Sequence, residues 1–457
     1  MGQIEKRPVL REDLYEFRFL SEPSISPDGH WAAYVVNRAD KKTNGYLSSI
    51  WAVNLKTEEN KLLAARGGAG SPVWLDSDTL LFTSGREQEK EDAKKETKVY
   101  RISLGGGEAS CLMTIPQKAE KLVPLGGSKY LVLSEAYEAS EGERTEQGEE
   151  EAKEGEDYYI FQELPFWFNG KGFCSRKRLA LYLCDAESGR MERLTKPFLE
   201  VTSFDVSPDK RKVAYSGPLY DSVRPRTSAL YLYDMESGET AQLTDDKQYD
   251  SDRVCFLGET RVFYTGTTWE RVGKHPRYYL YDLESGESRQ LPYCDSSIGS
   301  SVGSDSAFGK GRSMAYCKET DTLYMIQTSW GSSNIAAMSP DGTVEEITKL
   351  QGAVLGFDVK ENTMVMTAMR GDGLAELYEV CPESGEEKKL TGFNDAYLES
   401  HKIVTPEELR YESRNGYVMN GYVIRPAGYM PGQKYPAVLE IHGGPKTASG
   451  SVFFHEM

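Results

Sequence analysis

The stretch ALYLYDMESGETAQLT at residues 229–244 carries the pattern that decides the fold. Apolar and aromatic residues alternate with polar ones on both sides of a Ser-Gly turn, which is typical of a β-hairpin. Seven copies of this phrase, some of them looser, lie at residues 50–63, 99–113, 179–195, 229–244, 278–292, 334–348 and 376–391. An internal repeat of this kind indicates an architecture built from stacked units.

The spacing of the copies identifies the unit. Successive turn glycines from Gly189 to Gly385 are 43–56 residues apart. A further strand pair precedes each copy, often opened by Ser-Pro-Asp, as in SISPDGHWAAYVV at residues 24–36. Four strands in about 40–50 residues are typical of a propeller blade. The sequence therefore predicts an all-β, seven-bladed β-propeller over residues 21–400, preceded by an N-terminal segment, 1–20.

One interval of the repeat is much longer than the others. Residues 138–157 fill it with a low-complexity run of ten acidic and two basic residues, a net charge of −8 in a chain of −17. Such a run is usually a solvated loop, so we expect an insertion in the third blade, outside the ring. An acidic surface that docks a basic partner is the functional alternative.

Composition excludes several classes of function. No basic patch suggests nucleic-acid binding, and no apolar stretch is long enough to span a membrane. The seven cysteines contain no CxxC pair, and no His, Cys and carboxylate residues show metal-ligand spacing. We therefore expect a cytoplasmic protein that binds neither nucleic acid nor membrane, contains no metal and needs no cofactor.

The last sixty residues change in character. Residues 406–426 read as two alternating strands joined at Arg414-Asn415-Gly416, and a loop rich in Pro and Gly follows. The apolar run AVLEI at 437–441 is typical of a strand that is buried on both faces. It leads directly into His442-Gly443-Gly444-Pro445.

A glycine pair after a buried strand has a chemical use. Enzymes that transfer acyl groups need backbone N–H groups aimed at the developing oxyanion, and glycine lets bare backbone approach the substrate. An HGG-type motif in this position is an oxyanion loop in lipases and esterases. The alternative is an ordinary glycine turn at the end of a strand.

With these motifs the sequence resembles the prolyl oligopeptidase (S9) family of serine peptidases, and most closely its acylaminoacyl-peptidase branch. The resemblance is carried by AVLEIHGGP with SGSVFFHEM downstream, by the Ser-Pro-Asp-Gly blades and by ELPFWFNGKGF at 163–173. It implies a propeller that caps an α/β-hydrolase domain and admits only short peptides to a Ser-Asp-His triad. It also implies that Gly444 donates its backbone N–H to the oxyanion, within a loop that includes Gly443. His442 stands where the prolyl-specific branch has a tyrosine donor, which favours the acylaminoacyl branch.

The triad itself is not visible in the sequence. In α/β-hydrolases the nucleophile and its partners follow the oxyanion loop, but the chain continues for only thirteen residues after Gly444. We therefore expect residues 401–457 to be the truncated start of the hydrolase domain, with residues 1–20 packing on that domain. The remaining hydrolase portion would then be a partner. Gly299-Ser300-Ser301-Val302-Gly303 matches the nucleophile motif, but it lies in a polar loop, and we interpret it as a chance match.

The aromatic residues Phe166, Trp167 and Phe168 have two readings. They form either an ordinary blade strand and turn or a propeller loop that faces the active-site chamber and binds substrate.

These observations predict a parent serine peptidase that hydrolyses short peptides with access gated by the propeller. The chain alone is expected to be inactive, and a homo-oligomer is compatible with the sequence. The alternative is a non-catalytic propeller that serves binding or assembly, and a third reading is an incomplete gene product. Peptide specificity and exo- or endo-action are not encoded in any motif that we recognise.

Overall fold

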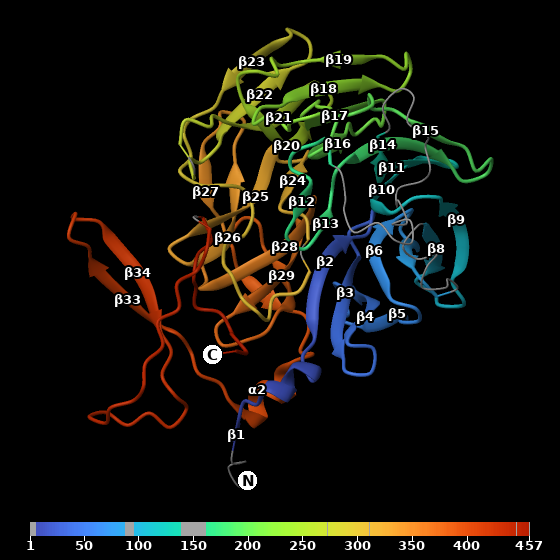
Figure 1. Ribbon diagram of the computed structural model, residues 1–457. Helices are drawn as coiled ribbons and strands as arrows, with labels where there is room; N and C mark the ends of the chain where they lie inside the picture. The colour runs from blue at the N-terminus through green and yellow to red at the C-terminus, as the bar shows by residue number, and fades with distance from the viewer. Residues whose placement is uncertain are drawn as a thin grey trace, which may run out of the picture. The chain divides into compact units, whose positions relative to one another are not determined.

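The computed structural model describes residues 6–86, 96–138, 161–271, 273–309, 311–444 and 446–456 (Figure 1). Contacts divide the chain into two compact units. The first comprises residues 1–87, 100–110 and 295–457, and the second comprises 88–99 and 111–294. The acidic insertion predicted at 138–157 lies, apart from Glu138, outside the described residues.

The second unit contains three four-stranded antiparallel sheets, each built from strands in chain order. The first consists of β10 (Ala119–Gly126), β11 (Lys129–Tyr137), β14 (Lys177–Asp185) and β15 (Met191–Arg193). The next consists of β16 (Ser203–Val206), β17 (Lys212–Gly217), β18 (Ala229–Asp234) and β19 (Thr240–Gln242). The last consists of β20 (Asp250–Leu257), β21 (Arg261–Thr267), β22 (Arg277–Asp282) and β23 (Glu287–Gln290). A short hairpin, β12 (Trp167–Phe168) and β13 (Gly172–Phe173), projects between β11 and β14 in the chain.

The first unit repeats this arrangement. Its opening sheet consists of β2 (Phe19–Ile25), β3 (Trp31–Asp40), β4 (Gly45–Asn54) and β5 (Asn60–Ala64). Its later strands are β24 (Met314–Cys317), β25 (Thr322–Ser329), β26 (Ser332–Met338), β27 (Val344–Glu346), β28 (Gly352–Lys360), β29 (Thr363–Arg370), β30 (Glu376–Val380) and β31 (Glu387–Lys389). These eight strands form two antiparallel groups of four, joined by the single parallel pair Ser333–Ala353.

A further sheet has the order β6 (Ala69–Trp74), β7 (Thr79–Ser84), β8 (Thr97–Ser103) and β9 (Ser110–Ile115). Two of the boundaries between the two units in the sequence, after residues 99 and 110, fall within β8 and β9. The described strands thus group by fours along the chain, as the repeat predicts. Because β24–β31 share one sheet, the count of seven blades stays a prediction.

The recurring turn is built by its aspartate and its glycine. In the hairpin β18–β19, one carboxylate oxygen of Asp234 accepts the backbone N–H groups of Glu236 and Ser237, both at 2.9 Å. Gly238 has φ +73°, a left-handed conformation that favours glycine. The hairpins β14–β15 and β22–β23 use an aspartate and a glycine in the same way. The phrase Asp-x-Glu-Ser-Gly therefore encodes its own turn.

Sheets in the same unit bury each other's faces. In the first unit, Leu20 of β2 and Tyr34 of β3 form a buried cluster with Val365 of β29 and Leu377 of β30. The opening sheet of the repeat therefore packs against the last one. In the second unit, Leu131 and Leu181 pack with Tyr215 and Tyr231 of the next sheet, and the two tyrosine rings stack at 5.2 Å.

The N-terminal segment packs onto residues that follow the last blade strand. Residues 11–15 form a single 3-10 helix, η1 (Arg11–Tyr15), and β1 (Arg7–Pro8) pairs in parallel with β32 (His401–Lys402). The short helix α2 (Asp395–Ser400) precedes β32, and the Tyr397 ring of α2 meets the Phe17 ring edge-on at 5.0 Å. In the described part of the chain, the contacts of this segment are therefore with neighbouring residues of its own unit. Its predicted packing on a hydrolase domain stays a prediction.

The C-terminal region matches the expectation in one respect and differs from it in another. The predicted hairpin is present as β33 (Glu407–Glu412) and β34 (Val418–Val423), paired antiparallel. Residues 437–441, however, form no strand, and Val438, Leu439 and Ile441 are at least 82% exposed. A strand needs a hydrogen-bonded neighbour, and no described strand pairs with this run.

The end of the chain packs against the N-terminal segment and α2. Val452 and Phe453 are buried in a cluster with Phe17 and Tyr397. The described residues after 401 therefore belong to the first unit and form no separate compact unit. No helix in the described ranges is long and apolar enough to cross a membrane.

We predict that Leu20→Ala destabilises the protein by about 2–5 kcal/mol, because it leaves a cavity between the opening and last sheets. Leu62→Ala serves as the control, since Leu62 lies on β5 and is 51% exposed, and its effect should stay within about 0.5 kcal/mol. Urea denaturation followed by circular dichroism measures both. Equal, small effects of the two changes would show that the sheets do not pack as described.

Candidate functional site

The predicted oxyanion loop, residues 442–444, has backbone geometry that requires glycine. Gly444 has φ +142°, and a β-carbon added there would lie 2.7 Å from the backbone nitrogen of Lys446. A β-carbon on Gly443 would meet nothing within 4 Å. The Nδ1 atom of His442 lies 2.8 Å from the carbonyl oxygen of Gly443, so this imidazole bonds the loop itself.

The surroundings of this loop are open to solvent. His442, Gly443 and Gly444 are exposed, as is the apolar run before them. Backbone donors stabilise an oxyanion strongly only in a site that excludes water. The loop has the glycine backbone of an oxyanion site, but in the described residues nothing encloses it.

The Gly-x-Ser-x-Gly segment at 299–303 has the surroundings of a structural loop. The hydroxyl of Ser300 lies 2.9 Å from that of Ser333, and the backbone N–H of Ser301 donates to the hydroxyl of Thr328 at 2.9 Å. A nucleophile elbow joins a buried strand to a helix. This segment instead lies between β23 and β24.

One Ser-His-Asp grouping exists that the sequence did not reveal. The hydroxyl of Ser400 lies 3.0 Å from Nδ1 of His401, and Nε2 of His401 lies 3.6 Å from a carboxylate oxygen of Asp13. Asp13 is nearly 400 positions away from Ser400 and His401 in the chain. No spacing pattern could therefore predict that the three residues meet.

The hydrogen bonds of this grouping exclude a catalytic role. Nδ1 of His401 also lies 2.7 Å from the carbonyl oxygen of Tyr397, which can only accept, so Nδ1 carries the proton and cannot take one from Ser400. The hydroxyl of Ser400 donates instead to the carbonyl oxygen of Ala396 at 2.7 Å. His401 is also 2% exposed. The grouping therefore holds the N-terminal segment in place.

Asp13 is the centre of this contact. Burial opposes its ionisation, but hydrogen bonds from the Arg7 guanidinium, the Leu10 backbone and the Tyr397 hydroxyl outweigh burial and lower the pKa of Asp13. Burial, followed by the hydrogen bond to Asp13, raises the pKa of Tyr397. Asp13 is therefore a carboxylate and Tyr397 a neutral donor at neutral pH.

A group of aromatic side chains in the second unit forms an exposed surface, which we call the aromatic platform. It consists of Phe161, Phe166, Trp167, Phe168 and Phe173. The three predicted residues, 166–168, are 40–51% exposed. Phe161 stacks on Phe166 at 4.8 Å and packs against Phe173 at 5.1 Å. The structure thus brings the predicted residues together on one short hairpin, but tests no substrate role for them.

A buried ion pair fixes the base of the platform. The side chains of Glu163 and Arg178 are 1% and 0% exposed, and two nitrogens of Arg178 bond the two oxygens of Glu163. The guanidinium also stacks on Tyr220, 3.7 Å from the ring centroid. The backbone of Leu164 bonds Ser222 and Arg224, each at 2.8 Å. The glutamate that opens the phrase ELPFWF was the only sequence signal for this contact.

A cavity of about 430 Å³ adjoins the platform. Phe161, Leu164, Phe166 and Val223 supply its apolar walls, and Gln162, Glu163 and Ser222 supply polar ones. Leu164 and Val223 are 54% and 63% exposed. The platform and this cavity together offer a surface suited to apolar side chains.

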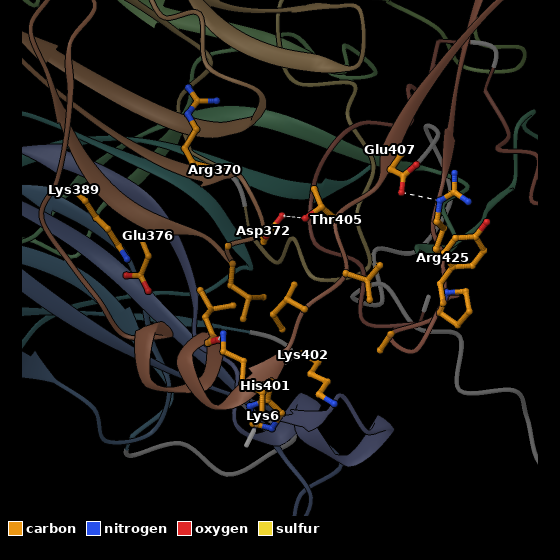
Figure 2. A pocket seen from close by; sticks show the side chains of 18 of the residues that line it. Lys6, Arg370, Asp372, Glu376, Lys389, His401, Lys402, Thr405, Glu407 and Arg425 are labelled. Atoms are coloured by element: carbon orange, nitrogen blue, oxygen red, sulfur yellow. Dashed lines mark hydrogen bonds and ion pairs between the residues drawn. The ribbon is translucent and has the colours of Figure 1, made fainter. Parts of the chain in front are cut away.

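A larger cavity, about 840 Å³, lies in the first unit (Figure 2). Its walls come from the end of β29, from β30 and from residues 401–407 and 425–429. Figure 2 shows Asp372 bonded to Thr405, and Glu407 paired with Arg425. Lys6, Lys389 and Lys402 add basic groups. None of the residues predicted from the sequence to act in catalysis or binding lines this cavity.

The buried acid of this cavity is satisfied by the protein. Burial raises the pKa of Glu376, although Thr391 and Asn394 donate hydrogen bonds to its carboxylate. Arg370 pairs with Glu387 at 2.8 Å. Nothing here leaves a buried charge in need of a ligand. Within the described ranges, no group of three or more His, Cys, Asp or Glu side chains is placed to hold a metal ion.

Comparison with known families identifies the repeat. Residues 147–372 match the model of the acylaminoacyl-peptidase N-terminal β-propeller domain. Over these residues, just under half of the chain, the sequence is similar to that propeller domain. This confirms the predicted all-β propeller, while the count of blades and the hydrolase domain stay predictions.

Similar proteins are peptidases by name. The uncharacterised peptidase YuxL of Bacillus subtilis is 29% identical over 463 residues, which cover 99% of this chain and 68% of that protein. Dipeptidyl-peptidase 5 of Porphyromonas gingivalis is 23% identical over 444 residues, covering 93% and 62%. The solved acylaminoacyl peptidase of Pyrococcus horikoshii superposes with a TM-score of 0.75 at 22% identity, covering 99% and 64%. The chain therefore spans about two thirds of the length of these relatives, and the comparisons support the peptidase resemblance.

We predict that Arg178→Ala destabilises the second unit by about 3–5 kcal/mol, because it leaves the buried carboxylate of Glu163 without a partner. Chymotryptic cleavage within residues 161–173 should accelerate with it. Arg190→Ala is the matched control, because Arg190 pairs with Glu192 at 2.9 Å on the surface, where such a pair contributes at most about 1 kcal/mol. Losses of similar size for the two variants would contradict the assigned role of the buried pair.

Proposed function

We propose that this chain is the propeller and oxyanion-loop part of a serine peptidase that hydrolyses short peptides. The single observation that carries the proposal is the glycine-dependent backbone at Gly444, in a His-Gly-Gly sequence that follows an apolar run. The propeller match and the peptidase names of the relatives support it.

In this proposal the backbone N–H of Gly444 stabilises the oxyanion that forms when a serine attacks the peptide carbonyl. Gly443 keeps the approach to that N–H open, and His442 fixes the loop through its bond to the Gly443 carbonyl. A serine activated by a histidine, which an aspartate orients, performs the attack. These three residues lie outside residues 1–457.

The aromatic platform supplies the substrate-binding surface of the propeller. Phe166, Trp167 and Phe168 present flat apolar rings that can hold the side chains of a short peptide without ordering long flexible groups. The buried Glu163–Arg178 pair keeps them fixed. In the proposed gating role, the propeller admits peptides and excludes folded chains from the reacting serine.

The exposed apolar residues near the loop are evidence that further strands, absent from this chain, cover them. Val438, Leu439 and Ile441 expose their side chains to solvent, and Tyr417 and Val418 of the β33–β34 hairpin are 70% and 57% exposed. An exposed apolar surface of this kind marks a binding interface. We infer that the remaining portion of an α/β-hydrolase domain covers it and converts residues 437–441 into a buried strand.

This proposal predicts that residues 1–457 alone neither hydrolyse acylated or free dipeptide nitroanilides nor react with a fluorophosphonate probe. The product of the complete reading frame should do both, because it supplies the nucleophile. Covalent labelling of Ser301, Ser400 or any other serine of the shorter chain would contradict the proposal. A reading frame that ends at residue 457 and gives a stable, inactive protein would favour a binding or assembly module instead.

The loop is tested in the active product. Gly444→Ala should lower kcat by about 10²–10³, as expected for loss of one oxyanion donor, because alanine is strained at this φ and its β-carbon meets Lys446. Gly428→Ala is the control, since a β-carbon there meets nothing within 4 Å. An unchanged kcat in Gly444→Ala would remove Gly444 from the mechanism.

A further inference from the structure

The residues that follow the oxyanion loop are held along one strip of the first unit. We call residues 446–456 the docked tail and residues 299–305 the docking strip. The backbone N–H of Ala448 donates to the carbonyl oxygen of Ser301 at 2.8 Å, and that of Gly303 donates to the carbonyl of Ala448 at 3.0 Å. Val302 and Ala448 thereby form a parallel bridge.

The strip continues to bind the tail with side chains. The hydroxyl of Ser304 donates to the carbonyl oxygen of Phe453 at 2.7 Å. One carboxylate oxygen of Asp305 accepts the backbone N–H of His455 at 2.9 Å, and the other accepts that of Glu456 at 2.7 Å. Both oxygens of Asp305 are thus used on consecutive residues of the tail. Hydrogen bonds to a carboxylate are stronger than those to a neutral acceptor.

Packing fixes the register of the tail. Val452 and Phe453 are 0% and 4% exposed, and the Phe453 ring meets Phe17 edge-on at 5.5 Å. A β-carbon on Gly450 would lie 2.2 Å from the carbonyl oxygen of Gly331 and 2.7 Å from Val302. The tail therefore fits only with glycine at this position.

The tail contacts shorten the stretch of chain between Gly444 and the nearest residue that is fixed on the first unit. Ala448 is four residues beyond Gly444, and a chain of four residues reaches at most about 14 Å. On the other side, the nearest strand ends at Val423, 21 positions before Gly444, and a chain of that length reaches about 70 Å. Without the tail contacts, the position of Gly444 would depend on that long segment alone. A catalytic donor must be held to within about 0.5 Å.

We propose that Asp305 is a positioning residue for the oxyanion loop. Its carboxylate binds the end of the docked tail, keeps Ala448 on the docking strip and so limits where Gly444 can lie. The Gly-x-Ser-x-Gly match at 299–303 is, in this account, a backbone docking element. The docking stands on the contacts themselves, and its effect on Gly444 rests on the proposed function.

Two measurements on residues 1–457 test the docking. Asp305→Ala should raise the exchange rate of the His455 and Glu456 amides by about tenfold or more, the factor for one lost hydrogen bond to a charged group. Tryptic cleavage after Lys446 should accelerate as the tail leaves the strip. Cleavage after Lys434, in the exposed loop before residue 437, is the internal reference and should not change.

Three variants make the result specific. Asp305→Asn keeps one acceptor oxygen and should give an intermediate effect. Gly450→Ala should release the tail by steric contact without touching Asp305. Asp76→Ala is the matched control, because Asp76 accepts two backbone N–H groups, at 2.9 and 2.7 Å, within its own turn between β6 and β7.

The outcomes separate docking from catalysis. If Asp305→Ala leaves exchange in 446–456 and cleavage after Lys446 at the wild-type rates, or if it loosens the blade strands equally, the positioning role is wrong. In an active product of the complete reading frame, Asp305→Ala should lower kcat and leave KM unchanged. Release of the tail with unchanged kcat would overturn the link to Gly444. An inactive wild-type product would contradict the proposed function and therefore the link between Asp305 and Gly444. The docking of the tail on the strip would not be affected by that result.

Discussion

Burial of both faces of each four-stranded sheet is the constraint on which the rest of the structure depends. The inner strand β28 is buried at every position from Gly352 to Val359, and only its last residue is partly exposed. The outermost strands carry the opposite composition, as in the Glu-Lys-Lys of β31. A single sheet of this kind cannot bury its inner strands, so it is stable only between neighbours. The contact between Leu20 and Val365 brings the first sheet of the repeat against the last.

The constraint also explains where the functional elements lie. The packing of the sheets does not constrain the sequence of the loops that connect them. The aromatic platform and the proposed oxyanion loop both lie outside the repeated strands. The aromatic platform is a hairpin between β11 and β14, fixed by the Glu163–Arg178 pair. The proposed oxyanion loop follows the last sheet, and the tail after it is held by the strip at 299–305. In each case the position of a segment outside the sheets depends on a few polar contacts.

Local chemistry decided how much could be predicted from the sequence. The hairpin at 229–244 was predictable because Asp234 and Gly238 build the turn within five residues. The strand predicted at 437–441 does not form within the described residues, because a strand depends on a partner elsewhere in the chain, and no described strand supplies one. The meeting of Asp305 with the tail, 150 residues away, leaves no periodic signal. The aromatic run at 166–168 was visible, but the buried pair that fixes it was not.

The central claim is that the backbone of Gly444 is an oxyanion donor in a serine peptidase. The most direct measurement is a crystal structure of the complete gene product after reaction with a peptidyl phosphonate. The account predicts that the Gly444 nitrogen lies about 2.7–3.1 Å from the phosphonyl oxygen, with residues 437–441 paired in a sheet. A phosphonyl oxygen bound by other donors, with the Gly444 N–H turned away from it, would contradict the account.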